Sequence, residues 1–414
     1  MWFKKNKDDQ EKILFYFYPM IKSISQRQLF LQHLAQTSTT PAALEIKKAK
    51  GIYLYDTSGK KYMDLISGIS VSSLGHGHPK IISAIKKQLD THAHVMVYGE
   101  FIQAPQVKLA ELLASVLPKS LSSTYFVNSG AEAIEGAMKL AKRFTGRTEI
   151  ISCKNAYHGS TQGALSIMGD EYFKNAFRPL LPDTKLIEFN NLNDIKKITT
   201  RTSSVITEPV QGEAGVIPAT KEFLKALRKK CSETGTLLIL DEIQTGYGRT
   251  GKLFAFEHYG IVPDVLVLAK AFGSGLPLGA FISSKKIMDS LSHDPVLGHI
   301  TTFGGNPVCC AASLATLNIL LKEKLVKQVA EKEKLFLKIL KHAQIKKARS
   351  KGLLIAIEFE TEEINKKIIS RCLEKGLISD WFLFNQNAMR IAPPLTITAK
   401  EIRQACKIIL DCLE

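Results

Sequence analysis

The sequence lacks the features of small disulfide-bonded and metal-binding proteins. Its seven cysteines, at positions 153, 231, 309, 310, 372, 406 and 412, form no Cys-x-x-Cys pair and have no metal-ligand spacing. An odd, scattered set in a long chain is typical of reduced thiols rather than of a disulfide framework or a zinc site. We therefore expect a cytoplasmic protein with no bound metal ion.

Long apolar runs are also missing. The N-terminal run at residues 13–21 contains Pro19 and is nine residues long, whereas a membrane helix needs about 20 residues. Acids and lysines mix before it, and no small-residue cleavage site follows it. We interpret the run as an arm or first helix that packs on the body and expect no membrane partner. A role at a membrane surface is the alternative.

Acidic residues are fewer than basic ones. The 39 Asp and Glu residues stand against 56 Lys and Arg residues, which gives a formal net charge of +17 at pH 7. Such an excess can indicate nucleic-acid binding. The sequence, however, has no helix-turn-helix, zinc finger or aromatic RNA-binding platform. We therefore expect a lysine-rich solvated surface and no nucleic-acid partner.

The 414 residues are 45% hydrophobic and 23% charged, which excludes a mainly disordered chain. No internal repeat or low-complexity linker is present. Seven strands are predicted at 123–127, 149–153, 185–189, 204–207, 236–240, 265–268 and 279–283. Helical periodicity fills several gaps between them, as at residues 132–144 and 221–233. This alternation predicts an α/β fold with a mostly parallel sheet covered on both faces.

The pattern changes after Pro307. The sequence then predicts a long helical stretch at about 310–342, a strand at 353–359, a helix at 362–375, an extended segment at 389–391 and a helix from about 400. A strand at 51–55 and a hairpin turn at 56–59 suggest that N-terminal residues join this smaller α/β unit. We expect an N-terminal arm with part of the small domain at 1–60, a large domain at 61–307 and a C-terminal small domain at 308–414.

Small and polar residues follow three of the predicted strands, at the edge where parallel sheets bind ligands. Ser129, Gly130 and Ala131 stand where a helix begins, so their backbone N–H groups can approach a phosphate. A plain N-cap role for Ser129 is the alternative. Asp241 and Lys270 follow two other strands and are 29 positions apart.

A lysine at the end of an apolar strand is unusual, because a buried ammonium group is costly unless it is paired or used chemically. Lys270 could form a Schiff base, Asp241 could pair with a pyridinium nitrogen, and the helix start could hold a phosphate. Together these are the groups that a protein supplies to pyridoxal phosphate. A buried structural salt bridge is the alternative.

Seven motifs stand in order between about residue 51 and the C-terminus. They are Gly75-His76-Gly77-His78-Pro79, 128–133, Ala156-Tyr157-His158-Gly159, 208–215, 241–251, 302–307 and 390–395. In these motifs the chain resembles the class III pyridoxal-phosphate-dependent aminotransferases. The resemblance implies an aspartate-aminotransferase-like α/β fold (fold type I). Its large, cofactor-binding domain would hold a mostly parallel seven-stranded sheet beside a smaller α/β domain.

The resemblance also implies roles for single residues. Lys270 would bind pyridoxal 5'-phosphate covalently and carry protons, and Asp241 would keep the ring nitrogen protonated. The other cofactor-binding residues would be Ser129, Gly130 and Ala131 at the phosphate, Tyr157 and His158 at the ring, Glu208, Gln244 near the ring 3-oxygen, and Thr302 at the phosphate of a neighbouring subunit. Because Thr302 would contact the cofactor of a neighbouring subunit, we expect a homodimer or a tetramer of two such dimers.

Substrate residues follow from the same resemblance. Arg390 matches the family's carboxylate-binding arginine, and Glu213 matches the acid that pairs with it when no carboxylate is bound. Ornithine and acetylornithine aminotransferases carry a second arginine where this chain has Ser160. The two tyrosines of ornithine enzymes align here with Thr37 and Ile69. Residues 173–182 and 299–307 are instead similar to putrescine aminotransferases.

We therefore expect an enzyme that moves the terminal amino group of a putrescine-like diamine, another ω-amine or an ω-amino acid to 2-oxoglutarate. The alternative within the family is an ornithine or acetylornithine aminotransferase. An aminomutase, racemase or decarboxylase would use the same cofactor, but an isomerase has no need of the Glu213–Arg390 pair. A non-catalytic binding protein of this fold is disfavoured by the intact Lys270 and Asp241.

Overall fold

The computed structural model describes residues 24–414, so the apolar run at 13–21 lies outside the described residues. The chain divides into two units, one of Met1–Lys48 and Tyr55–Lys60 and one of Ala49–Leu54 and Lys61–Glu414. The first unit contains helix α2 (Gln26–His33), which starts with a capping box between Ser25 and Gln28. Strands β1 (Ile46–Lys50) and β2 (Tyr53–Asp56) follow along the chain.

The second unit contains a seven-stranded sheet of order β4-β12-β11-β10-β7-β5-β6. Its strands are β4 (Ser123–Val127), β5 (Glu149–Cys153), β6 (Thr184–Ile187), β7 (Thr202–Thr207), β10 (Leu237–Asp241), β11 (Val265–Leu268) and β12 (Gly279–Ser283). Only β12 runs antiparallel to its neighbours β11 and β4. The predicted mostly parallel sheet is confirmed.

Alternating side chains of the central strand β10 pack into two different apolar cores. Leu238 and Leu240 join a cluster with Phe223 of helix α8 (Lys221–Thr234). Ile239 joins a second cluster with Ala137 of helix α6 (Gly130–Thr145). Because successive strand residues point to opposite faces, α8 and α6 cover opposite sides of the sheet. This two-sided burial explains why the central strand β10 carries apolar residues on both faces.

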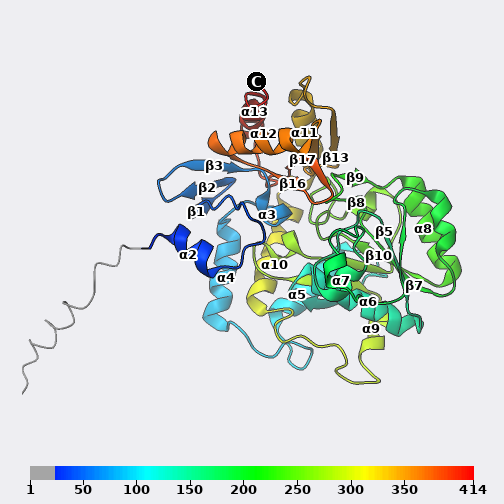
Figure 1. The fold of residues 1–414 in the computed structure, drawn as a ribbon. Coiled ribbons are helices and arrows are strands. Elements are labelled where there is room, and N and C mark those ends of the chain that lie inside the picture. Colours follow the sequence, from blue (N-terminus) through cyan, green and yellow to red (C-terminus); the bar gives the residue numbers. More distant parts are fainter. Residues whose placement is uncertain (1–23) are drawn as a thin grey trace, which may run out of the picture. The chain divides into compact units, whose positions relative to one another are not determined.

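The C-terminal part of the second unit has its own antiparallel sheet, of order β13-β14-β17-β16. Its strands are β13 (Lys347–Ser350), β14 (Ile355–Glu358), β16 (Asp380–Phe382) and β17 (Asn385–Ile391). Figure 1 shows helices α11 (Leu325–Ile339), α12 (Glu362–Glu374) and α13 (Ala399–Leu410) gathered near β13 and β17. Strand β15 (Leu377–Ile378) pairs in parallel with β3 (Lys61–Asp64).

The predicted helical stretch at 310–342 is two helices. Helix α10 (Pro307–Lys322) ends before Lys324, whose left-handed backbone (φ 54°) precedes α11. This residue stands outside helical geometry, so the chain turns there.

The remaining elements are α3 (Ser67–Ser70), α4 (Pro79–Thr91), α5 (Ala104–Val116), α7 (Gln162–Ser166), α9 (Lys285–Met288), β8 (Val210–Gln211) and β9 (Ile217–Pro218). Short 3₁₀ helices are η1 (Asn175–Phe177), η2 (Leu192–Lys197), η3 (Ala255–His258), η4 (Lys270–Gly273) and η5 (Asp289–Leu291).

All seven cysteines are buried and free of disulfide bonds. Within residues 24–414, no helix is long and apolar enough to cross a membrane. In the same part of the chain, no group of three or more His, Cys, Asp or Glu residues is placed to hold a metal ion.

Candidate active site

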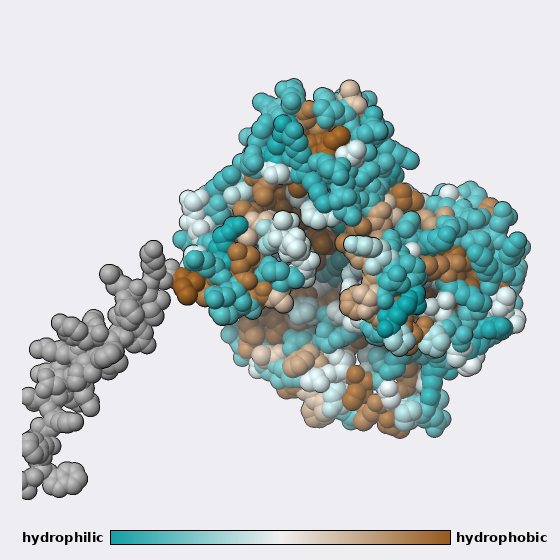
Figure 2. All heavy atoms as spheres, in the orientation of Figure 1, coloured by the Kyte–Doolittle hydropathy of each residue, from teal (hydrophilic) through white to brown (hydrophobic). Residues whose placement is uncertain are grey.

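A cavity of about 650 Å³ lies beyond the carboxyl ends of β4, β5, β7, β10 and β11. Figure 2 shows a hollow in the drawn face, in the region where Figure 1 places α3, β8 and β10. The residues that line it include nine named from the sequence: Ser129, Gly130, Ala131, Tyr157, His158, Glu208, Asp241, Gln244 and Lys270. Parallel strands bring these residues together because their carboxyl ends share one edge.

Lys270 is the first residue of η4, directly after β11, and its backbone is left-handed (φ 52°). Positive φ is costly for a residue with a side chain and is typical of functional sites. Burial lowers the pKa of the Lys270 amine, while Glu213 and Asp241 act in the opposite direction. A lowered pKa increases the unprotonated, nucleophilic fraction of this amine.

Asp241 is 4% exposed at the end of β10. Its Oδ2 lies 2.7 Å from Nδ1 of His158, and its Oδ1 accepts a hydrogen bond from the backbone N–H of Ile243 at 2.9 Å. Nε2 of His158 is buried and has no hydrogen-bond partner within residues 24–414. The pair places an oriented carboxylate in the cavity wall together with a polar atom that is free to bind a ligand.

The start of α6 forms another part of the wall. Ser129 is its N-cap, with a side-chain oxygen that accepts from the N–H of Glu132 at 3.1 Å, so the capping alternative holds for Ser129. A Cβ on Gly130 would come within 2.8 Å of Cδ1 of Ile243. Glycine therefore lets the first turn lie against Ile243, with its N–H groups and positive dipole end beside the cavity.

Glu208 is 5% exposed and accepts hydrogen bonds from the N–H groups of Gly212 (3.0 Å) and Tyr157 (3.3 Å). Burial raises the pKa of Glu208 well above its ordinary value, and the nearby Asp241 raises it further. Burial and the neighbouring carboxylate therefore both disfavour the charged form of Glu208.

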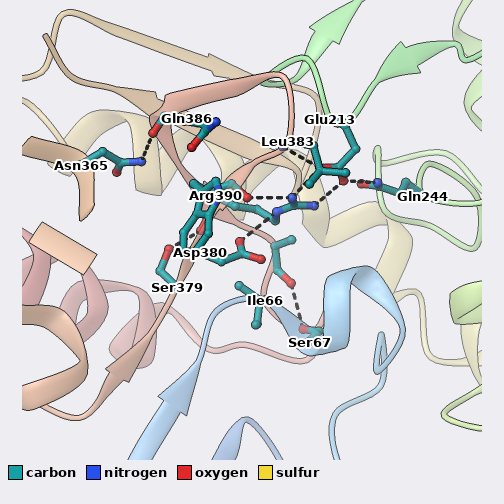
Figure 3. A network of polar contacts seen from close by, with 12 residues as sticks. Ile66, Ser67, Glu213, Gln244, Asn365, Ser379, Asp380, Leu383, Gln386 and Arg390 are labelled. Atoms are coloured by element: carbon teal, nitrogen blue, oxygen red, sulfur yellow. Dashed lines mark hydrogen bonds and ion pairs between the residues drawn. The ribbon is translucent and has the colours of Figure 1, made fainter. Parts of the chain in front are cut away.

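Arg390 and Glu213 form a two-pronged ion pair, with both N–O distances 2.8 Å and side chains 2% and 4% exposed. Figure 3 shows Gln244 on the far side of Glu213, and its Nε2 donates to Glu213 at 2.8 Å. The N–H of Leu383 also donates to Glu213, at 3.2 Å. Burial alone would raise the pKa of Glu213, but Arg390 brings it down to about 2.

Asp380 is a site residue that the sequence analysis missed. Its Oδ1 lies 2.9 Å from Nε of Arg390. Asp380 on β16 pairs with Arg390 on β17 in the strand register, whereas the sequence predicted only a short extended segment at 389–391. A β-hairpin prediction at 380–391 would have placed the two side by side.

Besides Glu213 and Arg390, which adjoin the wall at Gln244 but are not part of it, three residues named from the sequence do not line the cavity. Thr302 is exposed and stands outside the cavity wall. Ile69 in α3 is 37% exposed and does not line it either. Thr37 belongs to the first unit. Ser160 does line the cavity, and its Oγ lies 3.1 Å from the hydroxyl oxygen of Tyr157.

The cavity suits pyridoxal phosphate part by part. The Lys270 amine, with its lowered pKa, can react with the aldehyde of the cofactor, and the buried carboxylate of Asp241 can pair with its pyridine nitrogen. The N–H groups at the start of α6 can bind its phosphate. Two buried atoms of cavity-lining residues, Nε2 of His158 and Oε1 of Gln244, have no partner in the described part of the chain. Because unpaired buried polar atoms are rare in folded proteins, these two mark a place for a polar ligand.

Comparison with known proteins identifies the family. The family model for aminotransferase class III matches residues 34–413. An acetylornithine aminotransferase of Archaeoglobus fulgidus is 39% identical, over 92% of this chain and 98% of that protein. Another, from Methanocaldococcus jannaschii, is 41% identical over 86% of this chain and 89% of its own length.

A solved structure agrees with these sequence relatives. The ornithine aminotransferase of Toxoplasma gondii, with pyridoxal phosphate at partial occupancy in its active site, superposes with a TM-score of 0.86. It is 28% identical to this chain, and the match covers 99% of this chain and 98% of that one. Fold, cavity and relatives together show that this chain belongs to the class III aminotransferases, transferases of fold type I whose cofactor is pyridoxal phosphate.

Proposed function

We propose that this enzyme moves the terminal amino group of a putrescine-like diamine, another ω-amine or an ω-amino acid to 2-oxoglutarate. One observation carries the proposal. Among the described residues that line the cavity, Lys270 is the only lysine or arginine. Arg390 lies beside this wall and is already paired with Glu213. A donor without a carboxylate fits such a site, because its binding requires no further cationic side chain.

The acceptor needs a cationic group that binds its carboxylate. Arg390 can serve as that group when Glu213 moves away from it. While the amine is bound, Glu213 keeps the buried guanidinium paired, which avoids the cost of an unpaired buried charge. When 2-oxoglutarate enters, its carboxylate takes the place of Glu213 on the same two nitrogens. Gln244 lines the cavity and donates a hydrogen bond from Nε2 to Glu213, so the Glu213–Arg390 pair lies next to the cavity wall.

Pyridoxal phosphate, when bound, supplies an electrophilic carbon for the amine and an electron sink for the charge that develops on it. Lys270 would hold the cofactor through its side-chain amine, and the same amine would hold and move the proton of the substrate carbon. Asp241, oriented by His158, holds the proton at the ring nitrogen. The N–H groups of Gly130 and Ala131 bind the phosphate.

Other residues hold the cofactor from the sides. Tyr157 would pack on the ring, and Gln244, whose Nε2 donates to Glu213, would lie near the ring 3-oxygen. Glu208 would help to position Tyr157, because its carboxylate accepts a hydrogen bond from the backbone N–H of that residue. We also propose that Thr302 binds the phosphate of a partner subunit, which would account for its exposed position in a single chain. On this proposal the active unit is a homodimer in the cytoplasm. On the same proposal the large domain, residues 61–307, holds the cofactor, residues 1–60 form an arm with part of the small domain, and residues 308–414 form the C-terminal small domain.

Donor specificity is the deciding experiment. Purified holoenzyme is incubated with 2-oxoglutarate and, one at a time, putrescine, a longer diamine, ornithine and N-acetylornithine, and glutamate formation is measured. We expect the largest kcat/KM with a diamine. A clear preference for ornithine or N-acetylornithine would overturn the substrate assignment and leave the aminotransferase family unaffected.

Acetylornithine transfer is the second candidate, because relatives at 39% and 41% identity bear that name. Ser160 distinguishes the two, since an arginine at this position would add a donor-carboxylate site to the cavity wall. Ser160→Arg should therefore raise kcat/KM for N-acetylornithine relative to a diamine. Ser160→Ala is the matched control that removes only the hydroxyl contact with Tyr157.

A further inference from the structure

A second carboxylate contacts the substrate arginine on an edge that Glu213 does not use. Glu213 occupies Nη1 and Nη2 of Arg390, and Asp380 lies on Nε at 2.9 Å. Figure 3 shows the two acids on different sides of the guanidinium. They come from different elements, Glu213 from the segment after β8 and Asp380 from β16. The departure of Glu213 therefore leaves Asp380 in place.

We propose that Asp380 is a specificity-determining residue, which makes the acid–arginine cluster net negative and selects a donor with a second ammonium group over ligands with a carboxylate. The cluster holds two carboxylates and one guanidinium, so its charge is −1 when all three are ionised. The proposal rests on the proposed function, because it concerns the same substrate site.

The contact between Asp380 and Arg390 is an ion pair without hydrogen-bond geometry. Within residues 24–414, neither Oδ1 of Asp380 nor Nε of Arg390 has a hydrogen-bond partner. The Asp380 side chain is 25% exposed, against 2% for Arg390. Because Oδ1 itself is buried, Asp380 acts on a ligand through its charge and not through a hydrogen bond from this oxygen.

The electrostatic consequence is opposite for the two kinds of ligand. A carboxylate that approaches Arg390 meets a guanidinium that Asp380 already partly neutralises. An ammonium group meets a net negative cluster, and the charges of Glu213 and Arg390 both reach Lys270. At these short separations in a partly solvated site, one charge changes affinity by about fivefold to tenfold.

The other charged group that faces Asp380 is Asp64. Asp64 is bound by His76 at 2.8 Å and by the backbone N–H groups of Ile66 and Ser67. Burial, Glu213 and Asp64 all raise the pKa of Asp380, Arg390 lowers it, and it stands at about 6. Asp380 is therefore largely ionised at pH 7.5.

The test is Asp380→Asn in the holoenzyme. The amide oxygen can still lie on Nε of Arg390, so the change removes the charge and retains the shape. Glu360→Gln is the matched control, because Glu360 is an exposed acid of the same part of the chain and pairs with Lys346. Calorimetric binding of glutarate, which has two carboxylates and no amino or oxo group, is measured for each protein at pH 7.5.

We expect Asp380→Asn to bind glutarate about fivefold to tenfold more tightly than the wild-type protein and Glu360→Gln to bind it as the wild type does. Stopped-flow measurement should show the concentration of putrescine for half-maximal rate rising by a similar factor in Asp380→Asn, and that of 2-oxoglutarate falling. Weaker glutarate binding would show that Asp380 only positions Arg390, and unchanged binding would show no selective role. Either result overturns the proposal.

Two further measurements keep the test decisive. If Asp380→Asn does not fold, Asp380→Ser removes the same charge with a smaller side chain and must give the same direction of change. If the wild-type protein accepts no diamine, the proposed function fails. Glutarate binding still decides the effect of Asp380 on carboxylates, because that measurement involves no amine donor.

Discussion

Arg390→Ala should destabilise the protein by leaving Glu213 buried without its counter-ion. The pKa of Glu213 falls from the ordinary 4.5 to about 2 in the folded protein, which corresponds to about 3 kcal/mol at 1.36 kcal/mol for each pKa unit. Removal of one partner of a buried ion pair typically costs about 3–5 kcal/mol. We therefore expect the free energy of unfolding at pH 7 to fall by about 3 kcal/mol.

The pH dependence of this loss has a definite sign. In the wild-type protein the depressed pKa adds stability above pH 4.5, and this stability is lost as the pH falls toward 2. In Arg390→Ala the largest influence that lowers the pKa of Glu213 is gone, so burial raises this pKa relative to the wild type and protonation offsets part of the lost stability. The deficit of the variant should therefore narrow as the pH is lowered from 8 to 5.

A double-mutant cycle measures the pair directly. Urea denaturation is followed for the wild type, Arg390→Ala, Glu213→Gln and the double variant, and the coupling free energy should be about 3 kcal/mol. A coupling below about 0.5 kcal/mol, or a deficit that widens at low pH, would refute this reasoning. The same Arg390→Ala protein should lose the 2-oxoglutarate half-reaction far more than the amine half-reaction in stopped-flow measurements.

Four further predictions concern the proposed cofactor-binding residues. Lys270→Ala should lose the yellow, borohydride-sensitive absorbance of the purified protein, and a reducible protein–cofactor link in this variant would contradict the assignment. Asp241→Asn should still bind cofactor by absorbance titration but lose turnover by several kcal/mol in barrier, about a thousandfold; unchanged turnover would count against its role. Gly130→Ala should weaken cofactor affinity, measured by equilibrium dialysis, because its Cβ would come within 2.8 Å of Ile243. Mixing Lys270→Ala with a disruptive Thr302 variant should restore some activity through hybrid dimers, and a fully active monomer at low concentration would exclude shared sites.

Much of this fold was predictable from local pattern. The central strands β10 and β11 consist almost entirely of apolar residues because both faces are buried, so they stand out in the sequence. The start of α6 was predictable from Ser129 and the small residues after it, since N-capping depends only on neighbouring residues. Asp241 and Lys270 were identifiable because parallel strands place the residues that follow them at one edge.

Other features depend on contacts between distant residues, which local pattern does not contain. The position of Asp380 on Arg390 follows from the pairing of β16 with β17. The raised pKa of Glu208 follows from its burial beside Asp241, and the break at Lys324 follows from the packing of two separate helices. The sequence alone determined the fold class and the cofactor chemistry, because strand burial and helix starts are local properties. Only the tertiary structure decided which charges face each other around Arg390, because electrostatic pairing depends on distance in space and not along the chain.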